Sequence, residues 1–441
     1  MSKLALLGGD PVRTELFPAH NFIGAEEKQK VMEIMDSGVL SRFLGVWHDD
    51  FHGGDEVQAF EREWADSYQA THGVSVNSCT SGLYAAVGAA GVGPGDEVIV
   101  SPYTMTASVT AAVAFNAVPV FADIDPKNFC LSPDSIRARI TERTKAIIVV
   151  HLFGHPADMD EIMEIAAAHD ITVIEDCAQA PAATYRGRSV GTLGHMGVFS
   201  LNYHKHIHSG EGGIVVTNDD RLADRLCMIR NHAEAVVTGH EIDSLVNMVG
   251  FNFRLGEIEA GIGRVQLGKS QGLVDRRRDN LAYFNRNLPT VPGLRISPAA
   301  DYVEHSYYAA VLNYDAEAAG LSRDVLIKAL HAELPETGMR KGHGPLIGGG
   351  YVKPIYLYPM FQEQTAFGDK GCPFKCPHYK GKVNYAAGIC SETEKAHATI
   401  ITHEYMQPSM SESDIDDVLN AFAKVADNMD ALRKLDNSPR R

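Results

Sequence analysis

Short, continuous apolar runs recur along the first half of the chain, separated by segments with helical periodicity. Lys145–Val150 and Ile171–Ile174 are the clearest of these runs. A strand that is buried on both faces has such a composition, whereas a strand with one solvated face alternates apolar and polar residues. The pattern therefore predicts an α/β domain with a mainly parallel sheet covered by helices. In such domains ligands bind at the carboxyl ends of the strands.

The length of 441 residues is sufficient for one large and one smaller domain. A helical pattern around Glu257–Leu267 ends the regular α/β alternation, and the composition changes after it. We therefore predict a large domain over residues 1–270, a small C-terminal domain over 271–435 and a frayed tail over 436–441.

Charge and cysteine usage exclude several classes of function. The chain has 56 Asp and Glu against 40 Lys and Arg, which argues against a nucleic-acid partner. Seven scattered cysteines form no disulfide framework and favour a reducing cytoplasm. Cys372 and Cys376 are the one close pair and lack a second pair, so no metal site is predicted. No apolar run is long enough to span a bilayer, and no membrane partner is predicted.

One lysine lies in a segment that is unusually rich in histidine and glycine. Lys205 is followed by His206, Ile207, His208, Ser209 and the run Gly210–Gly213, while Asp176 ends an earlier apolar strand. Pyridoxal 5'-phosphate requires a lysine amine for its Schiff base and an acid that keeps the pyridine nitrogen protonated. Lys205 and Asp176 are therefore the predicted catalytic pair.

A turn rich in hydroxyl groups joins an early strand to an alanine-rich helix. It comprises Ser78–Gly82, and its backbone N–H groups lie at the predicted helix N-terminus. Helix N-termini bind phosphate through these N–H groups and the helix dipole. An ordinary helix cap has the same residue types, so the turn alone does not establish a cofactor site.

Five further blocks follow in the order typical of one enzyme family. They are Gly91–Val100, Pro119–Asp125, Val150–Asp158, Gly210–Gly213 and Gly250–Arg254. Together with the lysine and the phosphate turn, they resemble the DegT/StrS sugar aminotransferases over most of the chain. The resemblance implies a pyridoxal-phosphate-dependent transferase of fold type I. In that fold a large domain with a mainly parallel seven-stranded sheet is followed by a smaller C-terminal α+β domain.

The resemblance also assigns roles to individual residues. Lys205 forms the Schiff base, Asp176 pairs with the pyridinium and Gln179 hydrogen-bonds the phenolic oxygen. The phosphate contacts are Thr80, Ser81 and Ser200, together with Asn252 from the neighbouring subunit, which implies a homodimer with shared sites. Met105 stands where the family usually has an aromatic residue against the ring, and Cys79 where it usually has glycine.

The chemistry follows from the lysine itself. Relatives with histidine at this position remove oxygen from a sugar, whereas lysine supports transamination; Lys205 therefore predicts a transaminase of the EC 2.6.1 type. The amino donor would be glutamate or glutamine. A sugar dehydratase and a non-catalytic, cofactor-binding regulatory protein are the alternatives, and the presence of both Lys205 and Asp176 disfavours them.

The acceptor stays open among three branches of the family. Leu6–Arg13 and Cys376–Pro377 resemble the branch that acts on cyclitol ketones. Other branches aminate nucleotide-linked keto-sugars or a sugar aldehyde in lipopolysaccharide biosynthesis. An acceptor in amino-sugar or cell-surface polysaccharide biosynthesis is therefore predicted. The candidate acceptor contacts are Arg42, His305, Tyr307, Lys341 and His343.

Overall fold

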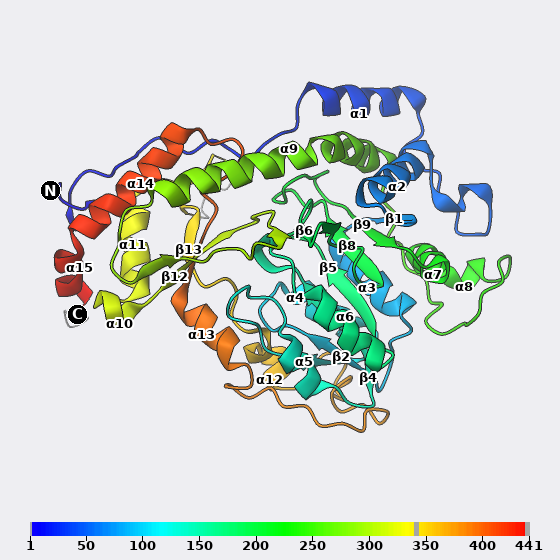
Figure 1. Ribbon diagram of the computed structural model, residues 1–441. Helices are drawn as coiled ribbons and strands as arrows, with labels where there is room; N and C mark the ends of the chain where they lie inside the picture. Colours follow the sequence, from blue (N-terminus) through cyan, green and yellow to red (C-terminus); the bar gives the residue numbers. More distant parts are fainter. Residues whose placement is uncertain (1, 339–343, 437–441) are drawn as a thin grey trace.

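The computed structural model describes residues 2–338 and 344–436 (Figure 1). Among these residues, the largest sheet has seven strands in the order β1-β9-β8-β5-β4-β2-β3. The strands are β1 (His72–Val76), β2 (Glu97–Val100), β3 (Val118–Phe121), β4 (Thr144–Val150), β5 (Thr172–Asp176), β8 (Met196–Ser200) and β9 (Gly213–Thr217). β9 pairs antiparallel with both of its neighbours, and the other pairs are parallel. The predicted α/β fold with a mainly parallel seven-stranded sheet is thereby confirmed.

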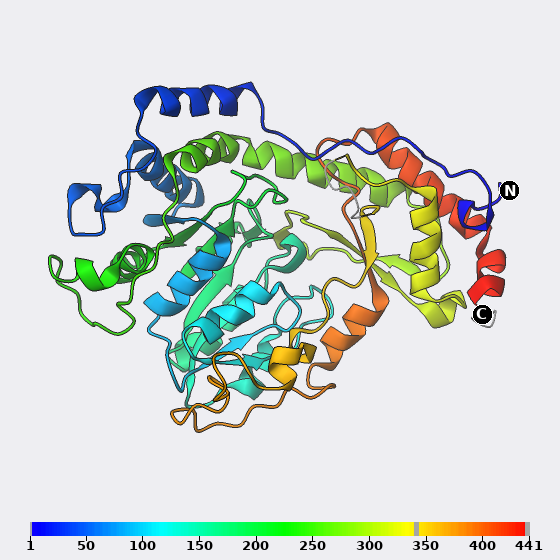
Figure 2. The ribbon, with the colours of Figure 1, turned by 180° about the vertical axis from the view of Figure 1, so that it is seen from behind.

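Helices cover both faces of this sheet (Figures 1 and 2). One layer contains α2 (Asp55–Tyr68), α5 (Pro133–Arg139) and α6 (Met159–Ala168); the other contains α3 (Cys79–Ala89), α4 (Thr106–Ala114) and α7 (Asp220–Arg230). Neighbouring residues of β4 face opposite layers. Ile147 belongs to the core beneath α2, α5 and α6, and Ile148 to the core beneath α3, α4 and α7. Two-sided burial explains why the strands are apolar throughout.

A second, antiparallel sheet lies beside the first, with the order β10-β12-β14-β13. Its strands are β10 (Leu294–Ile296), β12 (Ala310–Tyr314), β13 (Ile347–Gly349) and β14 (Ile400–His403), and α10 (Ala316–Ala319), α11 (Arg323–Glu333), α14 (Glu412–Asp427) and α15 (Met429–Asp436) pack near it. A small third sheet consists of β6 (Thr184–Tyr185), β7 (Arg188–Ser189) and β11 (Val303–Glu304). These elements form the α+β part of the fold.

The long helix α9 (Glu257–Asn287) connects the two parts (Figure 1). Ala260 near its start lies in the core of the large sheet, whereas Leu281 and Phe284 near its end lie in the core of the small one. The predicted helix over 257–267 was therefore too short, and the predicted boundary at 270/271 falls inside α9. The apolar periodicity that indicates a helix is interrupted after Leu267 by Gly268, Gly272 and the charged run Asp275–Asp279. Tertiary packing maintains the helix beyond them.

Two segments pack outside the domain in which their sequence position would place them. Leu4 and Phe17, from the N-terminal segment, belong to the core of the small sheet. The segment 355–390, with η4 (Ile355–Leu357) and α12 (Pro359–Gln362), packs against the large sheet, and α13 (Ser391–Thr399) follows it. Tyr356, for example, lies against Phe121 of β3 with ring centroids 5.7 Å apart. Of the predicted tail, residues 437–441 lie outside the described residues.

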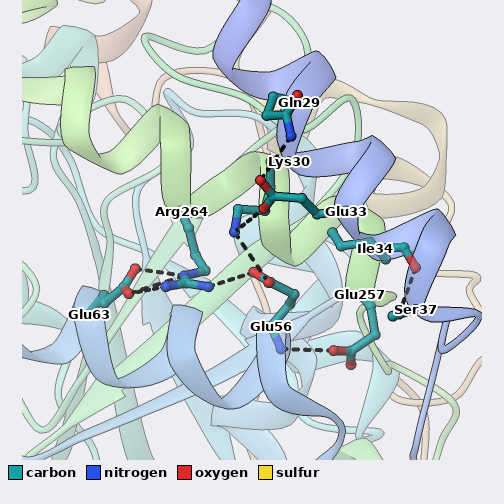
Figure 3. A network of polar contacts seen from close by, with 9 residues as sticks. All are labelled: Gln29, Lys30, Glu33, Ile34, Ser37, Glu56, Glu63, Glu257 and Arg264. Atoms are coloured by element: carbon teal, nitrogen blue, oxygen red, sulfur yellow. Dashed lines mark hydrogen bonds and ion pairs between the residues drawn. The ribbon is translucent and has the colours of Figure 1, made fainter.

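The N-terminal helix α1 (Ala25–Ser37) lies across α9 on the outside of the molecule (Figure 2). Figure 3 shows the polar network that joins these helices to α2. Arg264 of α9 forms ion pairs with Glu56 (2.6 Å) and Glu63 (2.5 Å) of α2, and Lys30 of α1 lies 3.4 Å from Glu56. Partly exposed pairs of this kind stabilise a fold only slightly, so their main effect is to orient α1 and α2 on α9.

In the parts of the chain that the structure describes, no helix combines the length and the apolar character needed to cross a membrane.

Candidate active site

A cavity of about 190 Å³ opens at the carboxyl ends of the parallel strands. Val150 ends β4, Asp176 ends β5 and Ser200 ends β8, and all three residues line it. Further lining residues come from the start of α3, from the approach to α4, from the loop between β8 and β9, and from the small-sheet region; they include Ser78, Cys79, Thr80, Thr104, Met105, Gln179, Asn202, His204, Lys205, Tyr308 and Tyr351.

Asp176 is held in one orientation by two hydrogen bonds. Its side chain is almost fully buried, Ser108 Oγ donates to Oδ2 (2.7 Å), and the backbone N–H of Ala178 donates to Oδ1 (3.1 Å). Thr104 Oγ1 lies 3.1 Å from Ser108 Oγ and supports it in turn. A buried carboxylate with only two donors keeps lone pairs for a further cationic or N–H partner. Asp176 is thus oriented to bind such a partner in the cavity.

Lys205 lies on the loop between β8 and β9 and is 9% exposed. The loop turns back on itself: Lys205 N donates to Asn202 O (2.9 Å), and an isolated β-bridge pairs the backbones of Asn202 and Gly210. His20 Nε2 donates to Lys205 O (3.1 Å), so the N-terminal segment covers the loop from outside. The Lys205 ammonium group lies 4.6 Å from the ring centroid of Tyr308, which is the geometry of a cation–π contact.

The first turn of α3 presents its N-terminus to the cavity. Ser78 caps this helix, since its Oγ accepts the N–H of Ser81 (3.0 Å). Ser78 and Thr80 line the cavity, but the Ser81 hydroxyl donates to Asn77 Oδ1 (2.6 Å) and is not among the lining groups. The turn Ser78–Gly82 is therefore at the cavity, where Ser78 and Thr80 are lining residues and Ser81 is not.

Gln179, Met105 and Ser200 also line the cavity. Gln179 Oε1 accepts the N–H of Phe153 (2.7 Å), and Nε2 donates to the Tyr351 hydroxyl (2.9 Å). Burial raises the pKa of Tyr351 to about 12, so this phenol stays neutral. Met105 is 57% exposed at the N-cap of α4, at the open side of the cavity.

The three predicted acceptor contacts that the structure describes do not line this cavity. Arg42 is exposed and forms an ion pair with Asp50 (3.0 Å). His305 and Tyr307 stack on each other with ring centroids 3.9 Å apart and line a different cavity beside Phe153. The neighbouring residue Tyr308 lines the Lys205 cavity instead. The remaining two candidates, Lys341 and His343, lie outside the described residues.

Asn252 lies outside the cavity of its own subunit. Its side chain is exposed, and Oδ1 accepts Arg254 Nε (2.8 Å). Its backbone carbonyl accepts Asn77 Nδ2 (3.2 Å), next to the start of α3. The side chain is therefore exposed and does not line the Lys205 cavity of its own subunit.

A buried group of potential metal ligands lies beneath Asp176, formed by His151, Glu175 and Cys177. Glu175 accepts hydrogen bonds from His151 Nε2 (2.9 Å) and from the backbone N–H groups of Gly191, Leu193 and Gly194 (2.8, 2.8 and 2.6 Å). His151 Nδ1 accepts the N–H of Ala157 (3.0 Å), so Nε2 carries the proton. These contacts satisfy both side chains, and the group is a structural support of the β5 terminus.

Comparison with known proteins identifies the class of protein to which this architecture belongs. The model of the DegT/DnrJ/EryC1/StrS aminotransferase family matches residues 22–374. The chain belongs to this family and is an aminotransferase.

Several relatives match almost end to end. The L-glutamine:2-deoxy-scyllo-inosose aminotransferase of Streptomyces kanamyceticus is 34% identical over 96% of this chain and 97% of its own length. GDP-perosamine synthase of Escherichia coli O157:H7 is 34% identical over 77% and 85%. Among solved structures, an aminotransferase from Psychrobacter cryohalolentis has a TM-score of 0.78 and 28% identity over 94% of this chain and all of that one.

Proposed function

We propose that this chain is a pyridoxal-5'-phosphate-dependent aminotransferase that transfers an amino group from glutamine or glutamate to the ketone of a polyhydroxylated ring. The observation that carries the proposal is that Lys205 and Asp176 line one cavity at the ends of parallel strands. When bound, the cofactor would act as the electron sink that makes the α-proton of an amino acid acidic.

The donor set of the cavity fits this cofactor. The carboxylate of Asp176 keeps lone pairs for a protonated pyridine nitrogen, and the α3 N-terminus offers backbone N–H groups beside Ser78 and Thr80 for a phosphate. Gly213 allows the close approach of β9 to this turn, because a Cβ there would lie 2.8 Å from the backbone of Ser78 and Cys79. Gln179 would contact the phenolic oxygen, and Met105 would lie against the ring; both residues line the cavity.

Lys205 would both hold the cofactor and move protons at Nζ. The residue is buried, and its Nζ lies against the face of the Tyr308 ring. An amine held in this way at the cavity wall is placed for general acid–base work. Asp176 would keep a positive charge on the pyridine nitrogen, and the hydrogen bond between Gln179 and Tyr351 holds the Gln179 amide in place.

For the acceptor we favour a cyclitol ketone, with glutamine as the donor. Relatives named as glutamine:scyllo-inosose aminotransferases match 96–98% of this chain at 31–34% identity. The second candidate is a nucleotide-linked keto-sugar, which is favoured by the match to GDP-perosamine synthase. A contribution to surface-polysaccharide biosynthesis is supported by the 31% identity to the spore coat polysaccharide biosynthesis protein SpsC of Bacillus subtilis over 92% of this chain.

We further propose a homodimer in which Asn252 reaches the phosphate of the neighbouring subunit. Exposed apolar side chains support this assembly, since Leu245, Val249 and Phe251 are 71%, 64% and 37% exposed. Trp47 stacks on His240 with ring centroids 4.0 Å apart, so the loop before α2 extends this apolar surface. Clustered exposed apolar groups of this kind mark interaction surfaces.

A matrix of donors and acceptors tests the substrate assignment. Glutamine and glutamate would each be combined with 2-deoxy-scyllo-inosose and with a nucleotide-linked 4-keto-sugar, and the aminated product would be measured by mass spectrometry. We expect the highest kcat/KM for glutamine with the cyclitol ketone. A higher kcat/KM for the nucleotide-linked sugar would select the second candidate, and no product from any pair would contradict both.

A further inference from the structure

His206, the neighbour of the proposed cofactor lysine, is buried and makes one specific hydrogen bond. It is 1% exposed, and its Nε2 lies 3.0 Å from the backbone carbonyl of Ser306. A carbonyl oxygen only accepts, so Nε2 carries the proton and donates. Burial holds the pKa of His206 well below its usual range, and the nearby Arg277 guanidinium lowers it further. The imidazole is therefore neutral and present as one tautomer.

Ser306 connects this histidine to the loop that carries Gln179. The residue is fully buried; its N–H donates to Gly154 O (3.0 Å), and its hydroxyl donates to Gln179 O (3.1 Å). Gly154 has φ +94°, and a Cβ there would lie 2.5 Å from Ser306 Oγ, so the junction requires glycine at that position. Since Phe153 N also donates to the Gln179 side chain, Ser306 and the 153–154 turn enclose Gln179 from two sides.

The segment around Ser306 is itself fixed to α9. The carbonyl of His305 accepts Arg278 Nε (2.9 Å), and the carbonyl of Tyr307 accepts Arg277 Nη1 (2.9 Å). Three successive carbonyls, of residues 305, 306 and 307, are thus each held by a side chain from another segment. Tyr308 follows directly and presents its ring to the Lys205 ammonium group. His206 is therefore attached to a rigid part of the molecule.

We propose that His206 and Ser306 are positioning residues that set where Lys205 lies relative to Gln179. The hydrogen bond from His206 fixes the backbone of the Lys205 loop, and the Ser306 hydroxyl fixes the backbone of Gln179. One residue, Ser306, thereby sets the distance between the amine and the amide that would flank the same edge of the cofactor. The inference rests on the proposed role of Lys205 and adds how the chain holds that lysine in place.

The test compares two forms of the cofactor, because only one of them bonds covalently to lysine. Pyridoxal 5'-phosphate uses the Lys205 amine, whereas pyridoxamine 5'-phosphate occupies the same cavity without it. We would measure the dissociation constants of both for the apo-protein of the wild type, His206→Leu and His206→Gln. Leucine keeps much of the buried volume but removes the donor, whereas the glutamine amide can still reach Ser306 O.

For His206→Leu we expect the affinity for pyridoxal 5'-phosphate to fall about tenfold, the effect of one lost buried hydrogen bond. The affinity for pyridoxamine 5'-phosphate should stay within about twofold of the wild-type value. His206→Gln should bind pyridoxal 5'-phosphate as tightly as the wild type does. Equal weakening of both ligands would assign His206 a merely structural role and overturn the proposal. Unchanged binding of pyridoxal 5'-phosphate would overturn it as well.

Two further measurements keep the outcome unambiguous. If His206→Leu does not fold, His206→Asn supplies the same comparison, because its amide is too short to reach Ser306 O. Borohydride reduction of the wild-type holoenzyme, followed by peptide mass spectrometry, identifies the lysine that carries the cofactor. Attachment to another lysine would contradict the proposed function. Attachment to Lys205, with normal binding by the His206 variants, would contradict only the positioning role.

Discussion

The two sides of the Lys205 cavity are built in different ways. The inner side consists of strand ends and a helix N-terminus: Asp176 and Ser200 end β5 and β8, and Thr80 lies in the first turn of α3. The outer side consists of residues from the small-sheet region and from loops, among them Tyr308, Tyr351 and the half-exposed Met105. Strand ends and a helix N-terminus carry groups that would hold a cofactor, and connecting segments from distant parts of the chain surround the space left for a substrate. In folds that act on many different substrates, the loops and connecting segments around the site are the parts that vary.

The strongest test of the inner side is Lys205→Ala. Among the described residues that line the cavity, Lys205 is the one lysine, so we expect the rate of transamination to fall by about 10⁴-fold or more, as for loss of a covalent catalyst and its proton transfers. The rate of 2-oxo acid formation from glutamine, in single-turnover and steady-state assays, measures the loss. The variant should still bind pyridoxamine 5'-phosphate, which shows that the cavity is intact. Turnover close to that of the wild type would remove Lys205 from the mechanism.

The same contrast explains what could be predicted from the sequence. Asp176, Lys205 and Thr80 each lie in a local pattern, namely a strand end, a glycine-rich turn and a helix start, and the structure places all three on one cavity. Tyr308 and Tyr351 reach it only through tertiary packing of distant segments, and no local pattern marks them. The sequence predicts His305 and Tyr307, three positions and one position before Tyr308, but these two residues line a different cavity, and the backbone at Tyr307 is left-handed (φ +52°).

Asp176→Asn tests the inner side with a smaller change. The amide keeps the shape of the side chain but removes the negative charge that would face the pyridine nitrogen. We expect kcat to fall about a thousandfold, which is typical of removing one preorganised electrostatic contact. Ser108→Ala serves as the matched control, since it removes only the hydrogen bond that orients Asp176 and should cost about tenfold. A fall of less than threefold for Asp176→Asn would show that another acid pairs with the cofactor.

Asn252 tests whether the outer boundary of the site belongs to a second subunit. Lys205→Ala subunits and Asn252→Ala subunits, each poorly active, would be mixed under conditions of subunit exchange. If Asn252 serves the neighbouring site, each heterodimer has one intact cavity and should regain about half of the native activity. Native mass spectrometry would establish the exchange. Without recovery in exchanged samples, Asn252 would be assigned to its own subunit, where its backbone already contacts Asn77.

The smallest expected effect separates two adjacent residues of the phosphate turn. Thr80 lines the cavity, whereas the Ser81 hydroxyl donates to Asn77 and is not among the lining groups, although the family resemblance assigns both to the phosphate. Thr80→Ala should weaken the binding of pyridoxamine 5'-phosphate about tenfold, the effect of one hydrogen bond to a charged group. Ser81→Ala should change it by less than about threefold and act mainly on thermal stability, through the lost contact with Asn77. Equal weakening by the two variants would mean that the turn rearranges when phosphate binds. The inner side would then be less rigid than its position at the strand ends implies.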